Sequence, residues 1–74
     1  MMTNFSVKTI RLTMGLSQHA FSKLIHATQG TVAKIESNSI SVEKHEVAIQ
    51  NLFNEWRENK IAALNEEIEF LRRL

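Results

Sequence analysis

Apolar residues recur every three or four positions along most of this chain, which is the period of an α-helix and not of a strand. The spacing of Val7, Ile10 and Met14 predicts a first helix from Asn4 to Met14, with these three side chains on its inward face. The sequence contains no sustained alternation and no dipeptide typical of a β-hairpin. The chain is therefore predicted to be all-α.

Residues with a side-chain hydroxyl predict where the next helices begin, and residues that tolerate a left-handed backbone predict where they end. Ser17, Thr28 and Ser41 can each cap a helix through a side-chain oxygen. Gly15 and Asn38 are suited to the left-handed backbone that ends a helix. The inward faces of these helices are expected to carry Phe21, Leu24 and Ile25, then Val32 and Ile35, and finally Val42, His45, Ile49, Leu52 and Phe53.

The C-terminal part of the chain, from Ser41 to Leu74, contains neither glycine nor proline. One unbroken helix of this length would extend about 51 Å, which is long for a small domain. Polar residues gather at Asn54–Asn59 and the apolar register shifts there, so we predict a break and a terminal helix from about Trp56. The expected architecture has five helices in all, with a domain over residues 1–54 and a C-terminal helix for association or packing over residues 55–74.

The composition excludes several classes of protein. The 74 residues have room for one domain, and they include no cysteine, aspartate, proline or tyrosine. The chain therefore has no disulfide, thiolate zinc site or cysteine nucleophile. Its apolar runs are too short for a membrane span or a signal segment, so we expect a cytoplasmic protein. His19, His26 and His45 lack metal-ligand spacing, and no phosphate loop or nucleophile motif occurs; no enzyme, metal or cofactor is expected.

The net charge of +1 conceals two halves of opposite sign. Residues 1–40 carry four basic residues and one acid, for a net charge of +3. Residues 41–74 carry five basic residues and seven glutamates, for a net charge of −2. The basic half is thus the better match for a nucleic acid, and the acidic half for a protein partner.

A tight turn between two short helices is the most specific signal. The helix that begins at Ser17 is expected to end near Ile25, and the next begins at Thr28. Two short helices joined in this way form a helix-turn-helix, whose second helix can enter a DNA major groove. The stretches Gly15-Leu16-Ser17-Gln18, Phe21-Ser22, Ile25 and Thr28 to Asn38, with Val7 to Arg11 in register before them, resemble the Cro/C1-type (XRE family) helix-turn-helix.

This resemblance implies a set of DNA-binding residues and one structural ion pair. Gln18 matches a phosphate-contacting position, and Arg11 and Glu36 match a buried ion pair. At about 100° per residue, Val32 and Ile35 set the buried direction of the third helix, which leaves polar and small residues on its outer face. Glutamine and lysine there can hydrogen-bond base edges or phosphates. The predicted DNA-binding residues are Gln18, Thr28, Gln29, Gly30, Thr31, Lys34 and Asn38.

The C-terminal segment carries an apolar stripe in a heptad pattern. Ile61, Leu64, Ile68 and Leu71 fit the a and d positions of two heptads, and in a parallel pair Glu67 would face Arg72 of the partner. Either this stripe associates with another chain, or it folds back on its own domain together with Trp56 and Phe70. The predicted association residues are Trp56, Ile61, Leu64, Ile68 and Leu71.

Two functions of different classes remain open. The first is a sequence-specific transcriptional regulator of the kind found in bacteriophage genetic switches, a homodimer on a double-stranded DNA operator with its third helices in successive major grooves. The second is a modulator with the same fold, an antirepressor or corepressor, that binds another repressor protein. The few basic residues and the glycine at position 30 favour the second.

Overall fold

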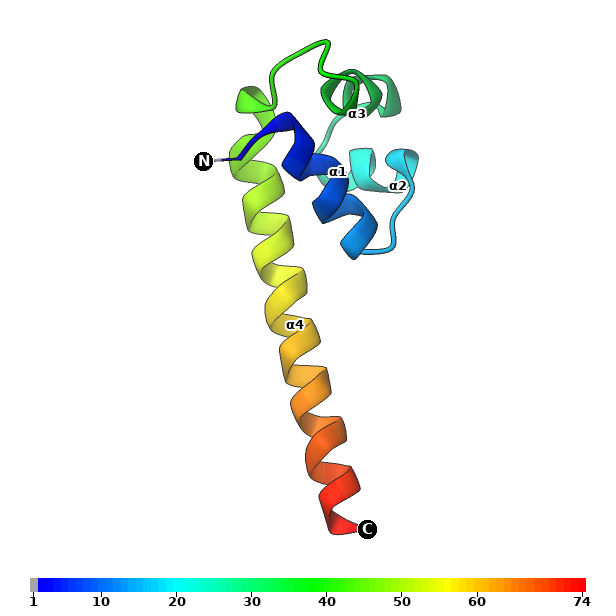
Figure 1. The fold of residues 1–74 in the computed structure, drawn as a ribbon, viewed down its shortest axis with the longest axis vertical. Helices are drawn as coiled ribbons and strands as arrows, with labels where there is room; N and C mark the ends of the chain where they lie inside the picture. Colours follow the sequence, from blue (N-terminus) through cyan, green and yellow to red (C-terminus); the bar gives the residue numbers. More distant parts are fainter. Residues whose placement is uncertain (1) are drawn as a thin grey trace.

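The computed structural model describes residues 2–74, and it is all-α over that range (Figure 1). Met1 lies outside the described residues. In chain order the elements are α1 (Asn4–Thr13), α2 (Gln18–Leu24), α3 (Gln29–Glu36), a 3₁₀ turn η1 (Glu43–His45) and α4 (Glu46–Arg73). The first three helices form a compact end, and α4 projects from it as a long stalk.

The predicted helix caps of the compact end are confirmed. The hydroxyl oxygen of Ser17 accepts a hydrogen bond from the backbone N–H of Ala20, and that of Thr28 accepts one from Thr31. Each bond satisfies a backbone donor that the first turn of a helix leaves without a partner. Gly15 has a φ of 71° and Asn38 a φ of 65°, so both adopt the expected left-handed backbone after a helix.

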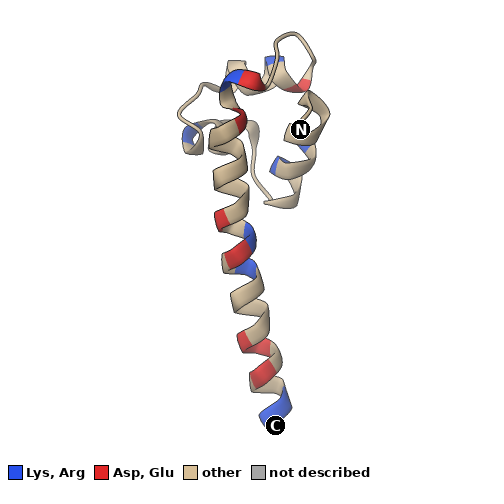
Figure 2. Cartoon of the chain, turned by 90° about the vertical axis from the view of Figure 1, so that its left-hand side faces the viewer, with Lys and Arg blue, Asp and Glu red and all other residues tan. Residues whose placement is uncertain are grey.

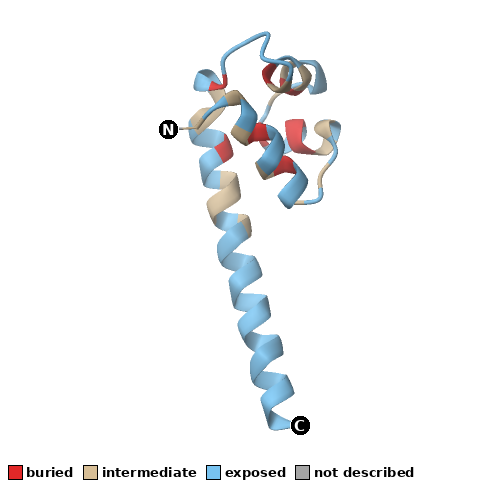
Figure 3. Ribbon diagram, viewed as in Figure 1, coloured by how far each residue is buried: buried red, intermediate tan, exposed pale blue. Residues whose placement is uncertain are grey.

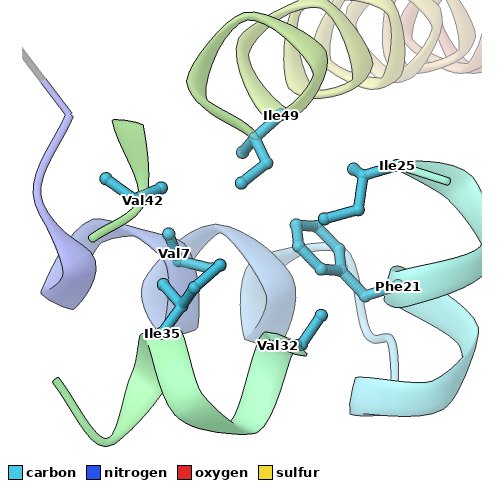
Figure 4. Packing of buried hydrophobic residues seen from close by; sticks show 7 residues of the cluster. All are labelled: Val7, Phe21, Ile25, Val32, Ile35, Val42 and Ile49. Atoms are coloured by element: carbon cyan, nitrogen blue, oxygen red, sulfur yellow. The ribbon is translucent and has the colours of Figure 1, made fainter. Parts of the chain in front are cut away.

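The buried core lies between the three short helices and the start of α4 (Figure 4). Val7, Phe21 and Ile35 are completely buried and come from α1, α2 and α3 in turn. Ile49 closes the core from α4 and is also completely buried. Burying these side chains is the main favourable term for so small a domain. The full set of buried apolar residues is Val7, Phe21, Ile25, Val32, Ile35, Val42 and Ile49.

The predicted break at Asn54–Asn59 is wrong, and with it the count of five helices. One helix, α4, runs unbroken from Glu46 to Arg73, so the expected terminal helix is its second half. The polar residues that suggested a break bond to one another along the helix surface instead. Gln50 and Arg57 both donate to the side-chain oxygen of Asn54, at 3.0 and 3.1 Å. Polar side chains at this spacing are compatible with a continuous helix.

The expected start of the fourth helix at Ser41 is also wrong. The Ser41 hydroxyl does accept a hydrogen bond from the N–H of Glu43, at 3.1 Å. The residues after it form the turn η1, and α4 begins only at Glu46. Val42 is buried in the core and fixes this turn against the three short helices.

The molecule is elongated, with extents of 51 × 23 × 18 Å. Every residue of α4 after Trp56 is exposed, whereas the first half of the helix is partly covered by the compact end (Figure 3). Within residues 2–74, no helix has both the length and the apolar character needed to cross a membrane.

Candidate nucleic-acid interface

The arrangement of α2 and α3 depends on the turn between them. Ala27 donates its backbone N–H to the carbonyl of Ser22 at 2.8 Å, which closes the end of α2. His26 takes a left-handed backbone there, with a φ of 56°, a conformation that histidine tolerates better than most residues. Phe21 and Val32 are then buried together in the core. The turn and this packing hold α3 in a fixed orientation on α2.

The outer face of α3 is open to solvent. Gln29, Gly30, Lys34 and Ser37 are all exposed, on the side away from the buried Val32 and Ile35. Ala33 and Thr31 are half-buried at the edges of this face. The outer face therefore combines a long amide, a lysine and several small residues, which is a surface that another molecule can approach closely.

Gly30 lies on this face without any requirement from the fold. Its backbone does not adopt a positive φ. A Cβ added at this position would meet only the Thr28 hydroxyl, at 3.9 Å, which is an ordinary contact. A glycine in a helix costs about 1 kcal/mol relative to alanine, so its presence here is not explained by packing within the chain.

Thr28, Thr31 and Asn38, which the sequence also predicts at the interface, have structural partners. The Thr28 oxygen caps α3 and lies 3.0 Å from the Thr31 hydroxyl. The Asn38 side-chain oxygen accepts a hydrogen bond from Asn4 at 2.9 Å. These residues border the outer face of α3, and their hydrogen bonds help to set its two ends.

The ion pair between Arg11 and Glu36 is present and well buried. Arg11 Nε and Nη2 donate to the two carboxylate oxygens of Glu36 at 2.7 and 2.8 Å, and Nη1 donates to the carbonyl of Leu16 at 2.8 Å. The exposed fractions of the two side chains are 10% and 6%. This two-point contact joins α1 to α3.

The charge of Glu36 is stabilised within the pair. The hydrogen bonds from Arg11 lower the pKa of Glu36, against the opposing effect of burial, and a hydrogen bond from Gln18 also lowers it. Gln18 reaches the carboxylate at 3.3 Å, so its amide is engaged inside the domain as well as lying near the start of α2. Glu36 is the only acid of α3, and its charge is neutralised, which leaves Lys34 to define the charge of the outer face.

The compact end and the stalk differ in their charged residues (Figure 2). Lys8, Lys23 and Lys34 are exposed on the three short helices. Glutamates recur along α4, and two arginines lie at its C-terminal end. A polyanion would therefore be attracted to the compact end and repelled by most of the stalk.

The five predicted association residues do not lie together. The Trp56 ring stacks on that of Phe53, with centroids 5.9 Å apart, and it lines a groove with Leu24 and Leu52. Trp56 therefore faces its own domain. The other four, Ile61, Leu64, Ile68 and Leu71, are exposed along the second half of α4.

Asn4 is a structural residue that the sequence did not reveal. Its amide nitrogen donates to Asn38 and to the carbonyl of Ile40, at 2.9 and 2.7 Å. Its oxygen accepts the backbone N–H of Val42 at 2.9 Å. Asn4 thus holds the segment after α3 against α1. The partners lie 34 or more positions away in the chain, and no local pattern signals such a contact.

Within residues 2–74, no group of three or more histidine and glutamate side chains is placed to hold a metal ion. Comparison of the chain with protein-family models, with curated proteins and with solved structures finds no match.

Proposed function

We propose that this protein is a sequence-specific DNA-binding transcriptional regulator of the Cro/C1 (XRE) kind, in which α2 and α3 form the helix-turn-helix. The observation that carries the proposal is the outer face of α3. The inner face is fixed by Val32, Ile35 and the Arg11–Glu36 pair, while Gln29, Gly30 and Lys34 are exposed opposite them. A rigid helix with a polar, narrow outer face is what the major groove accepts.

The electrostatics of α3 support this proposal. Its one carboxylate is paired with Arg11 at 2.7 Å and points away from solvent, so it does not repel phosphates. Lys34 is then free to contact a phosphate or a guanine edge, and Gln29 to contact an adenine edge. Phosphate contacts dominate affinity, and the exposed lysines of α1 and α2 add to them.

Gly30 favours the modulator because it removes a side chain from the reading face, but it is also compatible with DNA binding. The fold has room for a larger residue at this position, so packing within the chain does not account for the glycine. A backbone or base edge that approaches α3 closely would account for it. The same glycine lies between Gln29 and Lys34, in the middle of the surface that we assign to DNA.

The test is selection of binding sites from a random double-stranded DNA library, followed by titration of the enriched duplex at two salt concentrations. Lys34→Ala and Gln29→Ala are expected to weaken binding about tenfold each, because each removes a contact to phosphate or base. Lys60→Ala and Gln50→Ala are the matched controls, since they remove the same side chains from α4. They are expected to change binding less than about twofold. A library that yields no preferred sequence, or α3 variants that behave like their controls, would overturn the proposal.

The second candidate function is a modulator that binds another repressor through the same fold. The observation in its favour is that Lys34 is the only basic residue of α3, which limits phosphate contacts. In that case the purified protein binds no duplex with preference, while it alters the operator binding of a second regulator. The titration above therefore separates the two functions.

A further inference from the structure

The second half of α4 leaves an ordered apolar surface without a cover. Ile61, Leu64, Ile68 and Leu71 are 45–58% exposed, and no other part of residues 2–74 packs on them. Their spacing of three, four and three residues places them in one stripe along the helix. We call these four residues the distal stripe. A large apolar stripe on a projecting helix is typical of an interaction surface.

The chain's own domain cannot cover this stripe without breaking α4. The residues of α4 that face the domain are Ile49, Leu52, Phe53 and Trp56. At about 100° per residue, the distal stripe lies roughly 90° around the helix axis from that set. The two sets also occupy different lengths of a continuous helix. The stripe is therefore directed to a partner that approaches from another side.

We propose that the distal stripe forms a parallel two-stranded coiled coil with the same residues of a second copy of this chain. The stripe has isoleucine at both a positions and leucine at both d positions, the combination that favours two parallel strands. A second copy is thus a partner whose shape matches every layer of the stripe. Because the interface is the same on both chains, the twofold axis lies along the stalk.

Charges beside the stripe agree with the parallel orientation. Glu67 occupies a g position and Arg72 the e position five residues later, so each glutamate faces the partner's arginine in a parallel pair. The twofold symmetry of the dimer repeats this contact, so it occurs twice. An antiparallel pair with the same four layers would instead bring the two Glu67 side chains close to each other, although Arg72 would then face Glu58 of the partner, which is also at an e position. The repulsion between the two glutamates makes the parallel copy the better match to the charge pattern.

The coiled coil has a defined start. In the same heptad register, the positions before Ile61 are Arg57, Asn54 and Gln50. These polar side chains are hydrogen-bonded to one another, and Arg57 lies over the ring of Phe53 at 5.8 Å. They are therefore engaged on their own chain, beside the compact end. The two helices are paired from Ile61 onward and separate toward the domains.

This dimer places both compact ends on the same side of the assembly. Figure 1 shows α3 at the end of the molecule opposite the C-terminus of α4. Two α3 helices in successive major grooves lie about 34 Å apart, so each must lie about 17 Å from the twofold axis. That offset is within the 23 Å width of one chain. The dimer itself does not depend on DNA binding, since it is measured without DNA.

The first test is sedimentation equilibrium of the full chain over a wide concentration range. The wild type is expected to be a dimer at high concentration. Leu71→Lys is expected to raise the dissociation constant at least tenfold, because it places two like charges across the axis. Phe70→Lys is the matched control: Phe70 is 59% exposed and Leu71 58%, yet Phe70 lies off the stripe. Equal effects of the two substitutions, or a wild type that stays monomeric, would overturn the proposal.

The second test determines the orientation of the strands. The chain has no cysteine, so a single Leu71→Cys substitution gives one site for oxidation. In a parallel dimer the two cysteines face each other, and a disulfide between the chains is expected. In an antiparallel dimer they lie about 15 Å apart, beyond disulfide reach. A dimer that cross-links only when Ile61→Cys and Leu71→Cys chains are mixed is antiparallel and contradicts the proposal.

Discussion

The two halves of α4 carry similar patterns of apolar residues, but the first half packs in the domain and the second is exposed. From Glu46 to Trp56 the helix is part of the domain, and Ile49 on it is completely buried. From position 57 to 73 the helix is exposed throughout, although it carries four aliphatic residues at helical spacing. The backbone does not change between the halves; the direction of the apolar face does. A shift in apolar register within a helix can therefore mark a change of packing partner without a change of secondary structure.

The largest expected difference between the halves concerns stability. Ile49→Ala is expected to lower the free energy of unfolding by about 4 kcal/mol, because it removes apolar contacts and leaves a cavity in a completely buried position. Ile68→Ala, 47% exposed on the same helix, is expected to change it by less than about 0.5 kcal/mol in dilute solution. Urea unfolding of both variants at low concentration measures the difference.

Repeating that measurement at high protein concentration separates packing from association. The wild type is expected to gain stability with concentration if its folded chains dimerise, and Ile68→Ala is expected to lose that gain. Ile49→Ala should keep the same concentration dependence as the wild type. A concentration-independent wild type would mean that the distal stripe is not paired.

Two ion pairs of the molecule, one buried and one exposed, give the next comparison. Glu36 pairs with Arg11 inside the domain, and Glu69 pairs with Arg73 on the exposed stalk at 2.6 Å. Glu36→Gln is expected to cost about 3 kcal/mol, since it leaves a buried arginine without its charge partner. Glu69→Gln is expected to cost less than about 0.5 kcal/mol, as is usual for exposed pairs. Thermal or urea unfolding at neutral pH compares them.

Acid provides a second measurement on the same pair. The pKa of Glu36 is lower in the folded protein than its ordinary value of 4.5, so the unfolded chain takes up the proton first. The stability that this group contributes is complete above that ordinary value, and it is lost as the pH falls through the lowered pKa. The wild type should therefore lose stability below about pH 4.5 more steeply than Glu36→Gln. Equal slopes would show that the pair does not contribute.

Local chemistry made much of the compact end predictable. The oxygens of Ser17 and Thr28 cap helices through contacts three residues away, and Gly15 and Asn38 adopt a backbone that few residues tolerate. Such contacts lie within one turn of the chain, and the sequence therefore displays them. The role of Asn4 was not visible, because its three hydrogen bonds connect segments far apart in the sequence.

The error at Asn54–Asn59 has a physical explanation. The polarity of this segment predicts a break, but Asn54 accepts hydrogen bonds from residues four positions before it and three after it. Helix-compatible spacing and the absence of glycine and proline outweigh the polarity. For the candidate interface, the exposure of Gln29 and Lys34 followed from periodicity, whereas their ligand cannot be read from the chain alone.

Substitution of Gly30 tests whether the outer face of α3 takes part in binding as well as in the fold. Gly30→Ala is expected to raise the free energy of unfolding by about 0.5 kcal/mol, because alanine restricts the unfolded chain and finds open space in the folded one. Binding to the selected duplex is expected to weaken at the same time, since the new methyl group occupies the surface assigned to DNA. A variant that is more stable and binds equally well would remove Gly30 from the interface.

Ala62→Gly on the stalk is the reverse control for that substitution. It is expected to destabilise the exposed half of α4 by up to about 1 kcal/mol and to leave the affinity of one domain for DNA unchanged. Helical content from circular dichroism and DNA titration measure the two effects separately. Loss of DNA binding by Ala62→Gly would show instead that the stalk contributes to the interface, directly or through the dimer.

The smallest expected effect tests the charges that flank the distal stripe. Arg72→Glu places a glutamate opposite Glu67 of the partner and is expected to raise the dimer dissociation constant about two- to threefold, the size usual for an exposed pair made twice. Arg73→Glu makes the same change of charge one residue later, where it disrupts only the contact with Glu69 of its own chain. It should leave the dissociation constant unchanged. Raising the salt concentration should reduce the effect of Arg72→Glu, because exposed charges are screened. If Arg73→Glu instead has the larger effect, the partner lies on another face of α4. The heptad register of the distal stripe, which distinguishes the second half of the helix from the first, would then have to be assigned anew.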